Sequence, residues 1–151
     1  IFWTQVSSRS TRGAQLRLLL SEPQLGPAGG LLELDAHAGE TSSSQSSLKT
    51  LASLESIWLN QAEQRRLLLN QLERCGWVTN QSSWQESLKL SIEPSLIERW
   101  LGANRPYRRA LEGTGEVSEA ALSELRRELL RQRGRALPQS LRHWRIEGRL
   151  D

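Results

Sequence analysis

The chain has 151 residues, of which 37% are hydrophobic and 25% are charged, and its formal net charge is +3. This composition lies near the average for folded proteins, so it excludes a wholly disordered chain and predicts a single domain. One cysteine excludes an internal disulfide and a zinc site built from thiolates, and no stretch approaches the ~18 consecutive apolar residues of a membrane span.

The first third of the chain is predicted to contain two short strands and one short helix. Residues 1–6 are apolar and aromatic enough for a strand, and the leucine-rich stretch 11–20 predicts a helix that ends before Pro23. Glycine and proline in 25–30 predict a tight loop, because these residues supply the backbone angles of sharp turns. Residues 31–35 then predict a buried strand.

The middle of the chain predicts a long helix followed by strands. Apolar residues recur at helical spacing over 48–75, and Gly76 suits the end of such a helix. An unbroken helix of this length would extend about 42 Å at about 1.5 Å per residue, so we expect a break near Asn60. Residues 77–79 and 84–92 alternate apolar and polar side chains, which predicts half-buried strands.

The last third predicts three helices and a final strand. Helical patterns cover 95–101, 106–111 and 118–133, and Ser118 is a suitable N-cap for the third of these helices. His143–Glu147 predicts the last strand. The chain has only five isoleucines and three valines, so leucine must fill the buried positions of any parallel strand.

Motifs for catalysis and metal binding are nearly absent. Neither the phosphate-binding G-x-x-x-x-G-K-[ST] nor the nucleophile motif G-x-S-x-G occurs. His37 and His143 lie far apart without a clustered ligand, which predicts no metal site. Three polar residues lie at the end of the strand predicted over 31–35 and are candidates for a site: Asp35, His37 and Glu40. Ligands bind beyond this end of a strand in open α/β sheets, so acid–base chemistry or substrate contact is one interpretation, and ordinary surface residues are the alternative.

Basic side chains are concentrated toward the C-terminus. Residues 1–98 carry eight basic and ten acidic side chains, whereas residues 99–151 carry twelve and seven. The guanidinium of arginine donates two parallel hydrogen bonds to phosphate oxygens and stacks on aromatic rings, so this end of the chain is a candidate for nucleic-acid contact. The candidate contact residues form a compact aromatic and basic cluster: Arg99, Trp100, Arg105, Tyr107, Arg108 and Arg109. The alternatives are a solvated helical surface for the arginines and core anchors for the two aromatic residues.

Two short stretches resemble segments of a known family. Leu25–Leu34 (LGPAGGLLEL) is similar to the L-x-P-G-G-x-L segment before the fifth strand of class I S-adenosylmethionine-dependent methyltransferases. Leu72–Trp77 resembles their L-x-x-A-G-F segment before the sixth strand, and 142–147 would be their antiparallel last strand. This resemblance implies an α/β fold: the C-terminal half of an open, mostly parallel sheet with covering helices and a helical insertion, 94–138, before an antiparallel last strand.

The same resemblance implies S-adenosylmethionine as a cofactor of the complete domain only. The family's glycine-rich cofactor loop and its ribose-binding acidic residue lie in the first two strands of that fold, and its acidic or Asn-Pro-Pro motif has no counterpart in Ile1–Ser10. No cofactor-binding or catalytic residue of this chain is therefore implied, and enzymatic activity stays open.

A second resemblance concerns the region after residue 83. Trp84–Glu86, Ile97–Gly102 and Arg105–Arg108 look like a C-terminal extension fused to some bacterial replication-associated recombination ATPases of the AAA+ class. This resemblance implies that the ATPase machinery lies upstream. The chain contains no methionine and begins Ile1-Phe2-Trp3, which also predicts a missing upstream part.

These observations lead to two expected functions. The first is the C-terminal portion of a methyltransferase-like domain, residues 1–151, without a complete active site and within a larger DNA replication or recombination protein. The alternative is a non-catalytic module of an AAA+ recombination ATPase that binds nucleic acid or protein. Both predict a cytoplasmic protein whose partners are DNA and an upstream domain of the same chain, and not a membrane.

Overall fold

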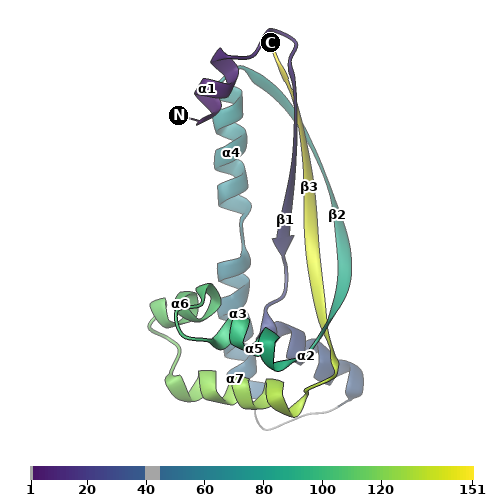
Figure 1. Ribbon diagram of the computed structural model, residues 1–151, viewed down its shortest axis with the longest axis vertical. Coiled ribbons are helices and arrows are strands. Elements are labelled where there is room, and N and C mark those ends of the chain that lie inside the picture. The colour runs from purple at the N-terminus through teal and green to yellow at the C-terminus, as the bar shows by residue number, and fades with distance from the viewer. Residues whose placement is uncertain (1, 40–44) are drawn as a thin grey trace. The chain divides into compact units, whose positions relative to one another are not determined.

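The computed structural model describes residues 2–39 and 45–151 (Figure 1). Its elements, in chain order, are α1 (Phe2–Ser8), β1 (Gln15–Pro23), α2 (Pro27–Ala38), α3 (Gln45–Leu59), α4 (Ala62–Arg74), β2 (Trp77–Ser91), α5 (Pro94–Leu101), α6 (Pro106–Gly113), α7 (Glu119–Arg131) and β3 (Ala136–Leu150). None of these helices is both long enough and apolar enough to cross a membrane, as judged over the described residues.

The chain divides into two compact units, and each is described by itself. The sheet unit comprises Ile1–Glu22, Asn60–Glu86 and Arg142–Asp151. The helical unit comprises Pro23–Leu59 and Ser87–Leu141.

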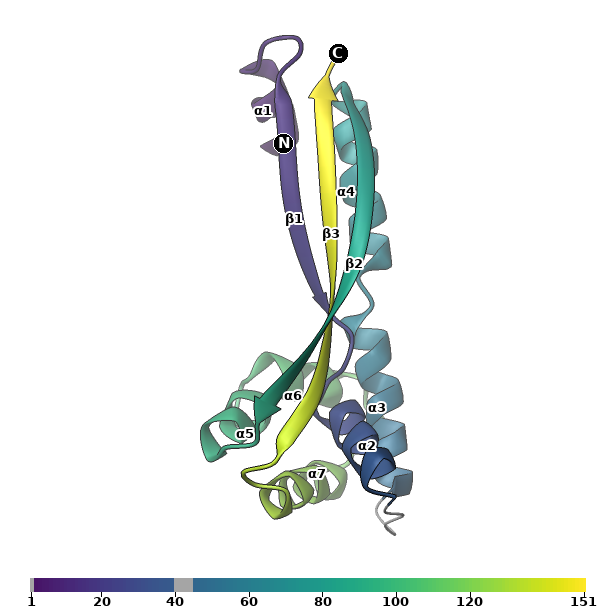
Figure 2. The same cartoon turned by 90° about the vertical axis from the view of Figure 1, so that its right-hand side faces the viewer.

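The strands form a three-stranded antiparallel sheet in the order β1-β3-β2 (Figure 2). On the β1 side, the Gly13 N–H donates to the Leu150 carbonyl at 2.7 Å. Further along, the Gln24 N–H donates to the Ser140 carbonyl at 2.8 Å, so β1 and β3 run in opposite directions. The predicted open, mostly parallel sheet is therefore wrong. Parallel strands buried on both faces need long Val- and Ile-rich runs, and this chain does not contain them.

The first two elements differ from the sequence-based expectation. The described part of 1–6, predicted as a strand, lies in the helix α1, and most of 11–20, predicted as a helix, lies in β1. Every second residue of Leu16–Leu20 is partly buried, whereas the intervening Leu19 is 63% exposed. This period of two residues is typical of a strand covered on one face. The sequence does not show this period, because three consecutive leucines place apolar residues on both faces of the strand.

The loop predicted over 25–30 and the strand predicted over 31–35 belong largely to one helix, α2. Gly26 is its N-cap, and Pro27 stands in the first turn, where the fixed φ angle of proline suits a helix. Leu31 and Asp35 are four residues apart and both buried, as expected of residues that share one helix face. The Gly-Pro stretch therefore starts a helix and does not connect a helix to a strand.

The helices predicted after residue 45 are confirmed. The long helical pattern is broken into α3 and α4, and the break follows from Asn60, whose Oδ1 accepts a hydrogen bond from the Ala62 N–H at 3.0 Å. α5, α6 and α7 lie where the sequence places them. The predicted N-cap of α7 is also present, because Ser118 Oγ accepts from the Ala121 N–H at 3.1 Å.

The strands predicted after residue 76 are confirmed as well. The pieces 77–79 and 84–92 belong to a single strand, β2, of 15 residues. The last strand, predicted over 143–147, is β3, which also has 15 residues. β2 and β3 are neighbours in the sheet as expected, whereas 31–35, predicted as a third strand of that sheet, lies in α2.

One face of the sheet in the sheet unit is covered by helices. α1 and α4 lie on the same side of the strands (Figure 1). The core on this side is built around Leu72 of α4, Trp77 of β2, and Ile146 and Leu150 of β3. The Trp77 Nε1–H donates to Ser7 Oγ at 2.7 Å, which fixes α1 against β2.

A buried ion pair completes the covered face of the sheet. Glu22 of β1 is 6% exposed, and its carboxylate binds the guanidinium of Arg65 of α4. The same carboxylate accepts a hydrogen bond from Trp144 Nε1–H at 3.1 Å, and Arg65 Cζ lies 3.8 Å from the centroid of the Trp144 ring. The charge of Arg65 is therefore shared between a carboxylate and an aromatic ring.

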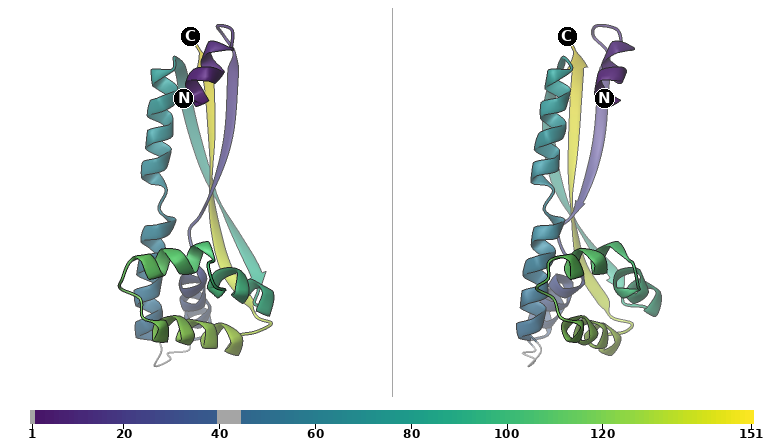
Figure 3. Two further views of the ribbon diagram at one scale, coloured as in Figure 1. Left: turned by 60° about the vertical axis from the view of Figure 1, so that its left-hand side comes forward. Right: turned by 90° about the vertical axis from the view of Figure 1, so that its left-hand side faces the viewer.

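The helical unit has its own core (Figure 3). Helices α2, α3, α5, α6 and α7 contribute apolar residues to a cluster that also includes Ile92 and Leu137. Its most completely buried large side chains are Leu31, Leu48, Leu51, Ile92, Ile97, Leu101, Leu111, Leu125, Leu129 and Leu137. Leucine thus takes the core positions that isoleucine and valine fill in many α/β proteins.

Candidate nucleic-acid interface

Tyr107, a predicted nucleic-acid contact, lies in the core of the helical unit. It is 2% exposed, and its hydroxyl donates to Glu55 Oε1 at 2.5 Å. The ring of Trp58 meets it edge to face, with centroids 5.7 Å apart. Trp100, from the same predicted cluster, is partly buried against this core. The buried ring of Tyr107 is therefore not accessible to a nucleotide base.

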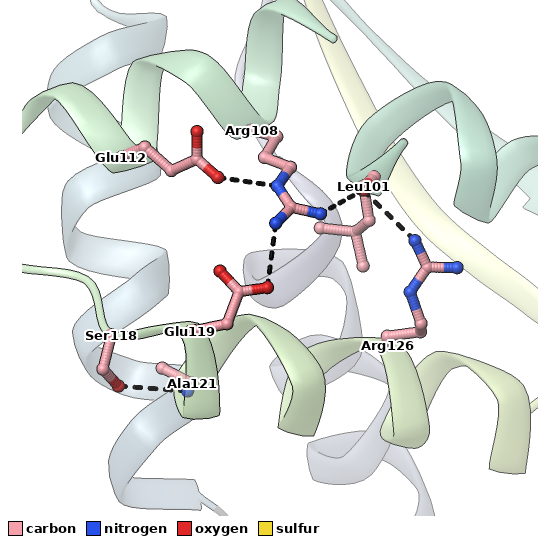
Figure 4. A network of polar contacts seen from close by, with 7 residues as sticks. All are labelled: Leu101, Arg108, Glu112, Ser118, Glu119, Ala121 and Arg126. Atoms are coloured by element: carbon pink, nitrogen blue, oxygen red, sulfur yellow. Dashed lines mark hydrogen bonds and ion pairs between the residues drawn. The ribbon is translucent and has the colours of Figure 1, made fainter. Parts of the chain in front are cut away.

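Arg108 is held in a network of polar contacts (Figure 4). Its Nε donates to Glu112 at 2.7 Å, and its Nη2 donates to Glu119 at 2.8 Å. The carbonyl of Leu101 accepts hydrogen bonds from Arg108 and Arg126, each at 3.1 Å. Two carboxylates therefore neutralise Arg108, which ties α6 to α7 and to the end of α5.

The other three predicted contact residues, Arg99, Arg105 and Arg109, are exposed on the surface of the helical unit. Arg99 is in the last turn of α5. Arg105 is the N-cap of α6 and Arg109 follows one turn later, so these two share a face of the helix. Arg105 and Arg109 therefore form a small basic surface on α6.

The predicted acid–base residues are not brought together at a strand end. Asp35 is buried in α2, whereas His37 is exposed and its Nδ1 lies 2.7 Å from the Glu33 carbonyl. Residues two apart on a helix point in different directions. Glu40 lies outside the described residues.

The start of α2 receives a buried carboxylate, that of Glu55, and Gly26 makes room for it. Glu55 is 1% exposed, and it accepts hydrogen bonds from the N–H groups of Ala28 at 2.7 Å and Gly29 at 3.0 Å. A Cβ atom on Gly26 would lie 2.4 Å from Glu55 Cδ, so only glycine allows this approach. Burial raises the pKa of the Glu55 carboxyl, and the hydrogen bonds from Tyr107, Gly29 and Ala28 oppose that increase.

In the sheet unit, the face of the sheet opposite α1 and α4 carries exposed arginines and apolar side chains. Figure 2 looks onto this face, with the strands in front of α4. We define the open sheet face by its alternate strand residues: Arg17, Leu19 and Ser21 of β1, Val78, Trp84 and Glu86 of β2, and His143, Arg145, Glu147 and Arg149 of β3. The apolar members are well exposed, with 63% for Leu19, 56% for Val78 and 42% for Trp84.

Trp84 is fixed in place by its neighbours on the open sheet face. Its ring stacks on the ring of His143, with centroids 5.2 Å apart and planes at 28°. The His143 ring is held at both nitrogens, since Nδ1 lies 2.9 Å from Ser21 Oγ and Nε2 lies 2.7 Å from Glu86 Oε2. Arg145 Cζ lies 5.5 Å from the centroid of the Trp84 ring. The guanidinium of Arg145 is thus held over the indole ring of Trp84 at a partly exposed position.

A hollow of about 510 Å³ lies at the other end of the same unit's strands. It is lined by Gln15, Leu16, Arg17, Val78, Glu147, Gly148 and Arg149. Arg17 pairs with Glu147 at 3.2 Å, and Arg149 pairs with Asp151 at 3.3 Å. The side chains of Arg17 and Arg149 are 77% and 69% exposed, so water screens both ion pairs and makes them weak. An anion that binds arginine more tightly than a carboxylate does can therefore replace Glu147 or Asp151 as the partner.

The sequence did not single out the open sheet face as a site. Trp84 was assigned to a half-buried strand, and 11–20, which contains Arg17, was predicted as a helix. A signal was nevertheless present, because Trp84 shares its alternating register with Glu86, and Arg145 shares its register with Glu147 and Arg149 in the last strand. Only the pairing of β1, β3 and β2 shows that these residues share one face.

No known protein family matches the chain, and no curated protein has a significantly similar sequence.

Proposed function

We propose that the protein is a nucleic-acid-binding module and that the open sheet face is its binding surface. The observation that carries this proposal is the placement of Arg17, Arg145 and Arg149 on one uncovered face together with the exposed ring of Trp84. Nucleic acids offer the two chemical groups that such a surface complements, namely phosphates for the arginines and bases for the ring.

The type and exposure of the cations on this face support the proposal. Its three cations are all arginines, and they stand close to the carboxylates of Glu86, Glu147 and Asp151, two of which pair with exposed arginines. Arginine is weakly hydrated and matches phosphate oxygens with two parallel N–H groups, so it binds phosphate at a modest cost of desolvation. A protein partner with an apolar face would match Leu19 and Val78 but would offer no anionic group to the arginines.

Over its described residues, the structure lacks the parallel sheet that the methyltransferase hypothesis requires. This hypothesis required a mostly parallel sheet, and the sheet is antiparallel. It also required a turn before a strand at Leu25–Leu34, where the chain starts α2. The second resemblance, to an extension of AAA+ recombination ATPases, includes Trp84–Glu86 and is compatible with a DNA-binding role.

The proposal predicts binding that weakens steeply as salt concentration rises. We expect the double variant R145A/R149A to bind a fluorescently labelled oligonucleotide about tenfold more weakly than the parent, because it has lost two phosphate contacts. The slope of log K against log salt should become shallower by about 1.4, given about 0.7 per phosphate contact to a single strand. Fluorescence anisotropy over a series of NaCl concentrations measures both quantities.

A matched variant controls for net charge. R105A/R109A removes two exposed arginines from the helical unit and changes the total charge equally. We expect its affinity to stay within about threefold of the parent, since these two arginines do not belong to the binding face and a change of net charge alone is screened by salt. Equal losses in the two double variants, or a parent that does not bind, would contradict the proposal.

A further inference from the structure

We infer that the nucleic acid bound on the open sheet face is a single strand, with one base stacked on Trp84 and the backbone following β3. This inference rests on the proposed function and specifies its ligand. It follows from the orientation of Trp84, from the spacing of the arginines on β3, and from the position of Glu147 between them.

Trp84 offers a prepared stacking surface. His143 supports one side of the indole, and Ser21 and Glu86 hold the His143 ring from both of its nitrogens. A side chain that is already held loses little conformational freedom when a base stacks on it. With 42% of its surface exposed, the Trp84 side chain has area left for that base.

The arginines of β3 lie along one line. Arg145 and Arg149 are four residues apart on the same face, which separates them by about 13 Å at about 3.3 Å per residue. Glu147 lies between them on this face and is paired with Arg17, so its charge is offset. A stretched single strand, whose phosphates repeat along its length, can therefore contact one arginine, pass the neutralised pair and contact the next.

A duplex does not meet this surface equally well. Its bases are already stacked on their neighbours, so they present their edges and not their planes. Stacking on an aromatic ring is the property that distinguishes single-strand binders, and it tolerates any base because every base has a planar face. The same chemistry fits single-stranded DNA and single-stranded RNA.

Substitution of Trp84 tests the inference. We expect W84A to weaken the binding of oligothymidylate and oligouridylate about tenfold, because the variant loses the stacking of one base on an aromatic ring. Binding to a mixed-sequence duplex should change by less than about twofold, because no base of the duplex stacks on Trp84. W84F keeps a ring and should retain most of the affinity, while the quenching of tryptophan fluorescence by the oligonucleotide should decrease.

A tryptophan of the helical unit provides the control. Trp58 is 43% exposed, nearly the same fraction as Trp84, so W58A removes an equally accessible ring from a different surface. We expect its affinity for both homopolymers to match that of the parent. Urea unfolding of each variant identifies any loss of fold before binding is compared.

The outcomes distinguish a failure of the single-strand inference from a failure of the proposed function. If R145A/R149A weakens binding but W84A does not, the open sheet face binds nucleic acid and the single-strand inference is wrong. Equal affinity of the parent for duplex and single strand would also overturn the inference. A parent that binds none of the three probes overturns the proposed function itself. A difference between oligothymidylate and oligouridylate shows whether the face prefers the DNA or the RNA homopolymer.

Discussion

Replacing Glu55 with alanine is expected to lower the free energy of unfolding by about 3–5 kcal/mol. The variant E55A would leave at least three donors without their acceptor: the buried N–H group of Ala28, the partly buried N–H group of Gly29 and the buried hydroxyl of Tyr107. Each buried donor left unpaired costs about 1–3 kcal/mol. Urea unfolding followed by circular dichroism measures the difference.

A smaller change isolates the contribution of one donor. Y107F removes the hydroxyl and leaves the two backbone hydrogen bonds to Glu55, so we expect a loss of only about 1–2 kcal/mol. If E55A were no more destabilising than Y107F, the carboxylate would not be the acceptor that holds the start of α2.

The same carboxyl predicts a dependence of stability on pH. Burial raises the pKa of Glu55 above its ordinary value of 4.5, so the folded protein keeps this proton to a higher pH than the unfolded chain. The contribution is complete below pH 4.5 and is lost as pH rises through the pKa of the folded state. Urea titrations at several pH values above 4.5 should show this decrease for the parent and a flatter profile for E55Q.

Removing the guanidinium of Arg65 is the second change with a large expected effect. In R65M the carboxylate of Glu22, which is 6% exposed, would lose its cation and keep the hydrogen bond from Trp144. Breaking a buried ion pair by removing one partner costs about 3–5 kcal/mol, because the remaining charge stays buried. We expect a loss near the lower figure, measured by urea unfolding.

The control for this prediction removes both charges. E22Q/R65M replaces the ion pair with a neutral amide and an apolar side chain of similar length, so most of the lost stability should return. Equal destabilisation in the single and the double variant would mean that Arg65 acts by packing on Trp144 and not by neutralising Glu22.

The sequence predicted the second two thirds of the fold better than the first third. The helical spacing of apolar residues over 48–75 and the apolar stripe of α7 both extend over several turns. A single residue that departs from the pattern therefore does not change the predicted element. In 11–20 three consecutive leucines suit either a helix or a strand, and only the packing against α4 selects the strand. In 25–35 the glycines indicated a loop, but Gly26 stands where a buried carboxylate approaches the start of α2, and Gly30 stands where the Pro138 carbonyl comes close.

The candidate site could be predicted only in part. The sequence predicted arginine beside an aromatic ring within residues 99–109. In that region, however, Tyr107 lies in the core, and Arg108 is neutralised by two carboxylates. The residues of the open sheet face come from three distant stretches of the chain. Sequence spacing does not show that Trp84 and His143 meet, because this contact depends on the register of β2 against β3.

The partition of the chain between its two units has a practical consequence. The backbone crosses from one unit to the other four times, after Glu22, Leu59, Glu86 and Leu141. Neither unit is therefore encoded by one uninterrupted stretch, and no single truncation isolates either of them. A genetic dissection of this protein must join separated segments with new linkers, and recombination between relatives at one crossover point would exchange pieces of both units together.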